Sequence, residues 1–237
     1  MQGFGSRVKK IQVMNIALIT ANIGGIDEIH APVKQKEDYE LFYVTENTLP
    51  FPLPNFNNRM KGKYFKTQPH TFLDHDIFIW LDSSVEIIDG TFITWVLEKL
   101  KSHEFVCSLH PDRNNVYDEI DHIIASMKKG NKYLLDRYAK QPFQQEKEFY
   151  LGEEMPKDYP LYNGWFYATR NNNRMNKIFD QWWELILRYT NFDQTQLAYV
   201  LWKNDVGVCV VETDLYLIRH KHKENNLIPE VNSQNKK

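Results

Sequence analysis

The chain has 237 residues, of which 42% are hydrophobic and 25% charged, and its formal net charge is −2. This length fits one large domain or two small ones, and the charge gives no overall basic field for nucleic acid. No apolar run approaches the roughly 18–20 residues that span a bilayer, and the N-terminus lacks the apolar segment of a signal peptide. We therefore expect a globular domain with no nucleic-acid partner and no transmembrane segment.

The two cysteines and the chain ends refine this expectation. Cys107 and Cys209 lie in strand-like apolar runs, which is typical of buried, reduced thiols in a cytoplasmic protein. We expect residues 1–13 to be a non-native remnant or a disordered arm, and residues 220–237 to be a polar tail. The folded domain is then expected at 14–219.

Short apolar runs and helical periodicities alternate along the chain. Strands are expected at 16–20, 41–45, 77–82, 105–109, 161–169 and 206–211. Helices are expected at 92–100, 115–127, 132–139, 174–189 and 194–202. Residues 46–58 carry three prolines and predict a loop, and the polar stretch 140–160 predicts an excursion or flap. The alternation predicts a single α/β domain, Rossmann-like, with a mainly parallel central sheet flanked by helices.

The expected strand at 77–82 carries the clearest functional signal. Five apolar residues lead into Asp82, Ser83 and Ser84, and open α/β sheets bind ligands at the carboxyl ends of such strands. A strand that ends in Asp-x-Asp holds a metal and a diphosphate in many nucleotide-sugar glycosyltransferases. Here Ser84 stands at the third position, and an acidic turn after a core strand is the alternative.

A basic cluster precedes this strand. Arg59, Lys61, Lys63 and Lys66 fall between the second and third expected strands. Cations beside a diphosphate neutralise its charge and assist the leaving group; lysine acts as a point charge, and arginine can grip two oxygens. The alternative is a solvated basic face.

Two further strand regions carry candidate sugar-binding groups. His110 and Arg113 follow the strand at 105–109, where Arg113 could bind a carboxylate, a phosphate or a sugar hydroxyl, or the segment could be a plain turn. Asn163, Gly164 and Trp165 combine an amide, a flexible glycine and an aromatic ring, which suits sugar binding. A core strand with a bulge at the glycine is the alternative.

Three residues in the C-terminal part of the chain each have a structural and a functional interpretation. Asp193 opens an expected helix, where it could be an N-cap, a general base or a ligand of an acceptor hydroxyl. His220 and His222 could supply an imidazole to a metal, since imidazole and carboxylate suit manganese-type ions. They could also be solvated residues of a basic tail.

Taken in order, these segments resemble a glycosyltransferase family of bacteria and plants once described only as a domain of unknown function. Its plant members include hexosyltransferase-like proteins linked to cell-wall polysaccharide. The resemblance spans roughly residues 15–205, and the order and spacing of the matching pieces carry it. The matching pieces are Lys63 to His70, Ile79 to Ser84, His110 to Arg113, Tyr117 to Glu119, Asn163 to Trp165, Trp182 with Trp183, and Phe192 to Gln194.

The resemblance implies a GT-A-type fold, a nucleotide-sugar donor that is most often UDP-linked, and a divalent cation, Mn²⁺ or Mg²⁺. It also implies a set of roles. The nucleoside would meet Thr20, Ala21 and Asn22; the diphosphate would meet Lys63 and Lys66; Asp193 would lie near the donor sugar and the acceptor; the metal would be held partly by Asp82, with Ser84 in the place of a second acid and His220 or His222 as a further ligand. Arg59 and Ser83 complete the expected donor site.

The sequence therefore predicts a glycosyltransferase that moves a hexose-type sugar onto a glycan or lipid-linked acceptor, with Asp193 as the base if the reaction inverts configuration. A non-catalytic nucleotide-sugar or glycan-binding protein on the same fold is one alternative, which Ser84 keeps open. A nucleotidyltransferase is another, although residues 22–25 are a poor version of its glycine-rich phosphate loop.

Overall fold

The computed structural model describes residues 14–28, 30–212 and 218–220, and its centre is a sheet with the strand order β2-β1-β3-β6-β5-β7. The strands are β1 (Ile16–Ala21), β2 (Glu40–Val44), β3 (Ile77–Leu81), β5 (Phe105–Leu109), β6 (Tyr162–Arg170) and β7 (Val208–Val210). β6 runs antiparallel to both of its neighbours, and the other five strands are parallel to one another. A second, two-stranded sheet pairs β4 (Val85–Ile87) with β8 (Ile218–His220).

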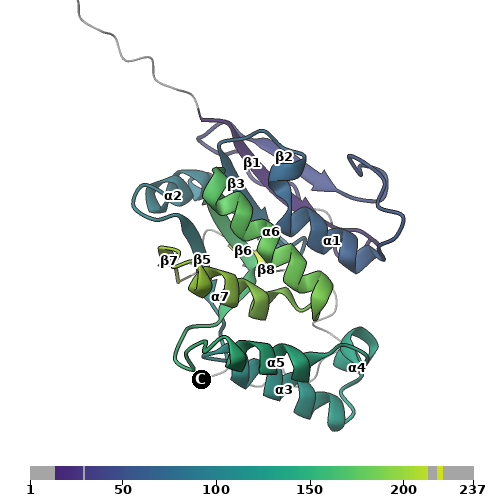
Figure 1. Cartoon of the computed structure of the whole chain (residues 1–237). Helices are drawn as coiled ribbons and strands as arrows, with labels where there is room; N and C mark the ends of the chain where they lie inside the picture. Colours follow the sequence, from purple (N-terminus) through teal and green to yellow (C-terminus); the bar gives the residue numbers. More distant parts are fainter. Residues whose placement is uncertain (1–13, 29, 213–217, 221–237) are drawn as a thin grey trace, which may run out of the picture.

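Helices cover the sheet (Figure 1). They are α1 (Asn58–Thr67), α2 (Phe92–Lys99), α3 (Val116–Lys128), α4 (Lys132–Tyr138), α5 (Phe143–Gly152), α6 (Asn173–Arg188) and α7 (Asp193–Lys203), with a short 3₁₀ turn at Pro69–Thr71. Helices α1, α6 and α7 share one apolar core with the sheet, and α2 packs in the other. Helices α3, α4 and α5 form a group beyond α7. The prediction of a single α/β domain with a mainly parallel sheet is confirmed.

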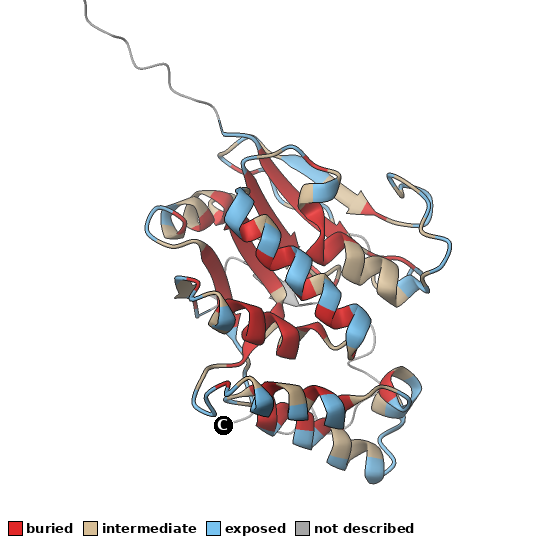
Figure 2. Cartoon of the chain, viewed as in Figure 1, coloured by how far each residue is buried: buried red, intermediate tan, exposed pale blue. Residues whose placement is uncertain are grey.

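The inner strands are buried on both faces, which explains their unbroken apolar sequences (Figure 2). Successive side chains of a strand point to opposite faces. Phe78 and Trp80 of β3 therefore enter the core with α1 and α6, whereas Ile77 and Ile79 enter the core with α2.

Most of the expected elements are present, but two helices were missed. Helix α1 was not predicted, because its central Gly62 and its many basic residues hide the apolar face; Asn57 caps it by accepting a hydrogen bond from the Met60 amide at 2.9 Å. The prediction of a flap at 140–160 is wrong, since this stretch contains α5. Tyr150 of α5 is fully buried.

Both cysteines are free thiols, Cys107 buried and Cys209 half-buried. Among the described residues, no helix is both long enough and apolar enough to cross a bilayer. The expected arm at 1–13 and the tail beyond His220 lie outside the described residues.

Glu146 of α5 forms a buried network that fixes the turn between α6 and α7. Its carboxylate accepts hydrogen bonds from Thr190 at 2.6 Å, Thr195 at 2.5 Å, Gln196 at 3.0 Å and Tyr150 at 2.7 Å. Thr190 belongs to the turn, and Thr195 and Gln196 belong to α7. Glu146 therefore anchors the start of α7 to α5.

Burial raises the pKa of Glu146 from 4.5 to about 7 even though four donors favour the charged form. The folded protein thus binds a proton that the unfolded chain releases. This proton binding by Glu146 stabilises the folded state fully below pH 4.5, and the stabilisation is lost as the pH rises through 7. We expect the Glu146→Gln variant to lack this loss, so that the difference in unfolding free energy between wild type and variant changes by roughly 3 kcal/mol across this range. Urea denaturation between pH 4 and 8 measures it.

The matched control is Glu148→Gln, at an exposed position of the same helix. Its pH profile should follow that of the wild type. Parallel profiles for wild type and Glu146→Gln would contradict the assignment.

Candidate functional site

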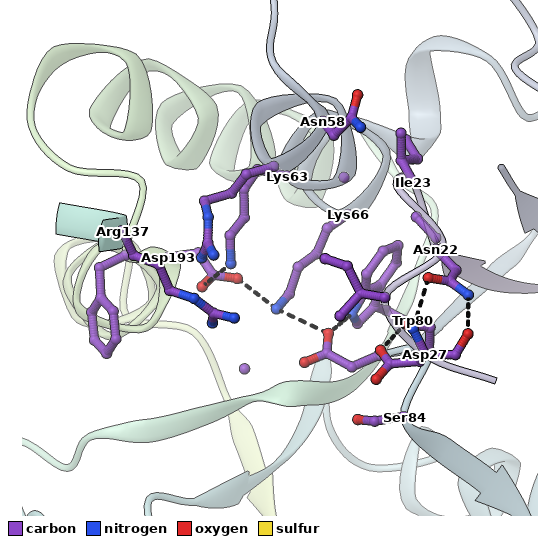
Figure 3. A pocket seen from close by; sticks show the side chains of 18 of the residues that line it. Asn22, Ile23, Asp27, Asn58, Lys63, Lys66, Trp80, Ser84, Arg137 and Asp193 are labelled. Atoms are coloured by element: carbon purple, nitrogen blue, oxygen red, sulfur yellow. Dashed lines mark hydrogen bonds and ion pairs between the residues drawn. The ribbon is translucent and has the colours of Figure 1, made fainter. Parts of the chain in front are cut away.

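A cavity of about 330 Å³ opens at the carboxyl ends of β1 and β3 (Figure 3). Its lining comes from the loop after β1, from α1, from the end of β3, from α4, from the bulged part of β6 and from the start of α7. The lining residues are Ala21, Asn22, Ile23, Ile26, Asp27, Asn58, Arg59, Gly62, Lys63, Lys66, Trp80, Asp82, Ser83, Ser84, Tyr133, Arg137, Tyr138, Gly164, Phe192, Asp193 and Gln194. Ten of the residues predicted from the sequence lie in this lining.

Three basic residues of α1 face the cavity because their spacing places them on one side of the helix. Arg59, Lys63 and Lys66 stand at positions i, i+4 and i+7, which share one face of a helix. Lys61 falls on a different face and does not line the cavity. The basic cluster is therefore not simply a solvated surface, because three of its four cations point to one cavity.

A continuous chain of charges crosses the cavity wall. Lys63 Nζ lies 2.5 Å from Asp193 Oδ1, and Lys66 Nζ lies 2.5 Å from Asp193 Oδ2. Lys66 Nζ also lies 3.6 Å from Asp82 Oδ1. The side chain of Lys66 is only 3% exposed and that of Asp193 only 6%, whereas that of Asp82 is 43% exposed. Two cations and two anions thus alternate along the cavity wall, with the buried Asp193 and Lys66 between the more exposed Lys63 and Asp82.

The pKa values follow from this arrangement. Burial alone would raise the pKa of Asp193, but Lys63 and Lys66 more than offset it and hold that pKa well below its ordinary value. Burial lowers the pKa of Lys63. The same burial acts on Lys66, but Asp193 and Asp82 outweigh it and raise its pKa. Asp193 and Lys66 are therefore both charged at neutral pH.

The ends of β3 and β6 fix Asp82. Its backbone amide donates to the Trp165 carbonyl at 2.8 Å, and its Oδ1 accepts from the Trp80 indole at 2.8 Å. The pairing of β6 with β5 jumps from Tyr167 to Asn163. This irregularity bears out the alternative interpretation of 161–169, a core strand with a bulge at the glycine, and the bulge brings Gly164 against Lys66 and Asp193.

The loop after β1 forms the opposite wall. Asn22 folds this loop by exchanging hydrogen bonds with the backbone of Asp27, and it also donates to the Tyr43 hydroxyl at 3.2 Å. Asp27 then accepts a hydrogen bond of 2.6 Å from the Ser83 hydroxyl. The β1 loop and the β3 end are joined through this bond.

Comparison with known families matches residues 47–225 to the TOD1/MUCI70, glycosyltransferase-like domain, about three quarters of the chain. The chain belongs to this family. Lys63, Lys66, Asp82 and Asp193 fall inside the matched range, and the β1 loop precedes it. No curated protein matches the chain. Membership in the TOD1/MUCI70 family supports glycosyl transfer as the general activity.

A divalent cation would find oxygen donors in this cavity. Asp82, Asp27, Ser83 and Ser84 line it together, and hard oxygen ligands suit Mg²⁺ and Mn²⁺. In the described part of the chain, no three His, Cys, Asp or Glu side chains lie close enough together to hold a metal. A cation bound at Asp82 and Asp27 would need further oxygen ligands, which substrate phosphates commonly supply to Mg²⁺.

Several predicted site residues do not line the cavity. Thr20 points to the opposite face of β1 from Ala21 and borders a separate small cavity. Asn163 lies behind the lining and accepts from Gln194 at 3.2 Å. Trp165 packs partly buried in the core beside α2 and contributes its backbone carbonyl to Asp82.

His110 and Arg113 also lie outside the lining, because β6 separates β5 from β3. The His110 Nδ1 atom accepts the amides of Asp112 and Arg113, and burial lowers the pKa of His110 to about 4, which keeps the ring neutral. Arg113 Nε lies 3.1 Å from Glu119. Both side chains therefore have structural partners.

The two histidines predicted as metal ligands are placed only in part. The backbone of His220 pairs with Val85, directly after Ser84 in the chain. His222 lies outside the described residues. His220 and His222 remain predictions.

The sequence did not identify the α4 wall of the cavity or Asp27. Tyr133, Arg137 and Tyr138 reach the cavity from α4. A tyrosine-arginine-tyrosine face at i, i+4 and i+5 was visible in the sequence, but the position of α4 relative to β3 depends on non-local packing. Trp182 of α6 is fully buried and donates to the Asp193 carbonyl at 2.9 Å.

Asp193→Asn should remove the shared anion and leave Lys66 with Asp82 alone. Removal of one partner from a buried ion pair typically destabilises a protein by about 3–5 kcal/mol, and we expect a loss of this size in urea denaturation at pH 7. Asp180→Asn is the control, because Asp180 is 53% exposed and pairs with His70 at the surface. It should cost less than about 1 kcal/mol. Equal losses in the two variants would refute the charge chain as a structural element.

Gly164→Ala should disturb the same chain sterically. A Cβ atom at Gly164 would lie 3.0 Å from Lys66 Nζ and 3.2 Å from Gln194 Cγ. We expect a loss of about 1–3 kcal/mol in unfolding free energy. Gly152→Ala is the matched control, since a Cβ there meets no described atom within 4 Å. A tolerated Gly164→Ala, with the same stability as Gly152→Ala, would show that the close approach is unimportant.

Proposed function

We propose that the protein transfers a hexose-type sugar from a UDP-linked donor to a glycan or lipid-linked acceptor, on a GT-A-type arrangement of its α/β domain. We place this activity in the cytoplasm, which the free thiols of Cys107 and Cys209 support.

The charge chain Lys63–Asp193–Lys66–Asp82 is the observation that carries the proposal. It presents ammonium groups and a half-exposed carboxylate to one cavity at the carboxyl ends of parallel strands. This edge of an α/β sheet is where ligands bind in open sheets. A diphosphate leaving group would be stabilised by the ammonium groups. It would also be stabilised by a divalent cation that the carboxylate holds together with the phosphate oxygens.

In this proposal the nucleoside lies against the β1 loop, beside Ala21 and Asn22, and the diphosphate lies between Lys66 and Asp82. Lys63 and Lys66 stabilise the negative charge that builds on the departing diphosphate. A divalent cation held by Asp82 and Asp27 with the serine hydroxyls would act there as a Lewis acid on the phosphate oxygens. Arg59 adds a further cation at the α1 face.

Asp193 has a conditional role in the reaction. While both lysines hold its carboxylate, its low pKa makes it a weak base. It could accept a proton from an acceptor hydroxyl only after the diphosphate draws at least one lysine away. We retain it as the candidate base of an inverting reaction and as an orienting group of a retaining one.

The test combines binding with turnover. With Mn²⁺ present, UDP and a UDP-hexose should raise the melting temperature, since a ligand specific for the native state stabilises it. Incubation with the UDP-hexose should release UDP. Stabilisation without UDP release, over a broad panel of acceptors, would support the non-catalytic alternative. Release of pyrophosphate from a nucleoside triphosphate and a sugar phosphate would support a nucleotidyltransferase.

Asp82→Asn is the decisive variant. The variant should still fold, because the Asp82 side chain is 43% exposed. UDP release should fall roughly 100-fold or more, because the amide would no longer hold the divalent cation that the proposal places at the diphosphate. Asp112→Asn, at a 60% exposed side chain outside the lining, is the control and should retain activity. Full activity of a folded Asp82→Asn protein would remove the central assignment.

A further inference from the structure

The turn between α3 and α4 carries a compact group of lysines. Lys128 is the last residue of α3, Lys129 follows it as the cap, and Lys132 is the first residue of α4. All three are exposed, and none of them lines the cavity described above. Leu135, one helical turn further along α4, is 36% exposed. We call Lys128, Lys129, Lys132 and Leu135 the basic turn, and Figure 1 shows α4 at the outer end of the group of α3, α4 and α5.

Hydrogen bonds fix the backbone of the basic turn. Gly130 takes a left-handed conformation with φ 86°, and its amide donates to the Met127 carbonyl at 3.0 Å. The Asn131 amide donates to the Ser126 carbonyl at 3.0 Å, which completes a motif that commonly ends helices. The Asn131 side chain then caps α4 by accepting from the Leu134 amide at 3.1 Å. The lysines therefore project from a well-defined corner of the fold.

The three lysines of the basic turn have no partner within the described part of the chain. None of their ammonium groups forms an ion pair or a hydrogen bond there. Lysines on nearby helices do pair, since Lys147 lies 2.6 Å from Asp121 and Lys203 lies 2.6 Å from Glu153. The cations of the basic turn are therefore available to a partner outside the chain.

Helix stability does not account for these charges. The dipole of α3 favours Lys128 and Lys129 at its C-terminal end, but the same effect disfavours Lys132 at the beginning of α4. No acidic residue stands in the sequence between Asp121 and Asp136. Three like charges within five residues therefore repel one another, and an anionic partner would relieve this repulsion.

The charge of this region is opposite to that of the rest of the chain. Residues 128–140 contain five basic residues and one acidic residue, which gives a net charge of +4. The other residues contain 24 basic and 30 acidic residues, which gives a net charge of −6. An extended anionic surface would therefore attract this end of the protein and repel the remainder, so that the charge distribution orients the molecule.

We propose that the basic turn docks the protein on a membrane surface that carries anionic lipids. Lysine is a compact, strongly hydrated point charge, which suits the diffuse charge of lipid headgroups, and clusters of exposed lysines bind such surfaces. Leu135 adds an apolar group that can enter the membrane interface. Anionic lipids are typical of the cytoplasmic leaflet, in line with the compartment proposed above.

Docking through the basic turn brings the cavity next to the membrane. Tyr133 and Tyr138, which line the cavity, belong to the same short helix as Lys132. Of the two acceptor classes in the proposed function, on which this step rests, the position selects the lipid-linked acceptor.

Co-sedimentation of the full chain with lipid vesicles tests the docking. The probes are vesicles of phosphatidylcholine alone and vesicles of phosphatidylcholine with phosphatidylserine. We expect binding to the anionic vesicles to be about tenfold tighter or more, and added salt should weaken it because salt screens exposed charges. Equal binding to both kinds of vesicle, or anionic binding that salt does not weaken, would overturn the inference.

Lysine variants connect the binding to the basic turn. The double variant Lys128→Gln, Lys129→Gln should bind the anionic vesicles roughly 20-fold more weakly, since each lysine near such a surface contributes about fivefold. The matched control is Lys34→Gln, Lys36→Gln, which removes the same charge at two exposed positions before β2 and should change the affinity less than about threefold. Equal losses in the two double variants would show that binding follows net charge alone, against the inference. Lys132→Gln, with an expected loss of about fivefold, decides the case if the first double variant fails to fold.

A soluble carboxylated dextran tests the other kind of polyanion that could meet the basic turn. At the same concentration of negative charge, we expect it to bind more weakly than the anionic vesicles. Tighter binding to the dextran, lost in the Lys128→Gln, Lys129→Gln variant, would assign the basic turn to a glycan and overturn the inference. UDP binding and release decide the proposed function separately, because none of the substituted lysines lines the cavity. A chain that binds anionic vesicles but neither binds nor releases UDP would refute the proposed function and keep the docking surface.

Discussion

The position of Lys66 constrains the whole site. Its ammonium group is almost fully buried between two carboxylates, Asp193 at 2.5 Å and Asp82 at 3.6 Å. An ammonium ion can be buried only where anions or dipoles replace its water. Helix α1, the end of β3 and the start of α7 must therefore meet at one point. The ring of Trp80, 5.7 Å from Lys66 Nζ, contributes a further favourable contact.

Local sequence signals identified the strands that supply the site. The run at Ile77–Leu81 is apolar at every position because β3 is buried on both faces, and this pattern needs no knowledge of the rest of the fold. Once β1 and β3 are taken as parallel strands, Asp82 and Asn22 must emerge at the same edge of the sheet. The sequence could therefore predict that the β1 loop and Asp82 share a cavity. It could also predict the bulge at Gly164, since glycine in a strand interior is typical of one.

The positions of the other candidate site residues depend on non-local packing and could not be predicted from local sequence. His110 also emerges at the carboxyl edge, but the antiparallel strand β6 is inserted between β5 and β3, and no local pattern reveals that strand order. Asp193 was equally ambiguous, since a carboxylate at a helix start is typical of an N-cap. In the structure Phe192 takes the cap position, and Asp193 turns inward to the lysines of α1, of which Lys63 is 130 residues away in sequence. Helix α5 was missed because its buried Glu146 counts as polar in any periodicity.

Hydrogen bonds from the network of Glu146 and from Trp182 hold the backbone at Asp193 in place. Glu146 fixes Thr190 before the helix and Thr195 within it, and the Trp182 indole holds the Asp193 carbonyl between them. The backbone at Asp193 is thus restrained on both sides by buried hydrogen bonds, which are stronger in a medium of low dielectric constant than in water. Buried ion pairs seldom increase stability over an apolar core of the same volume. A fold that fixes one carboxylate this firmly, and sets two ammonium groups against it at a cavity wall, is therefore better explained by the binding of an anion than by stability.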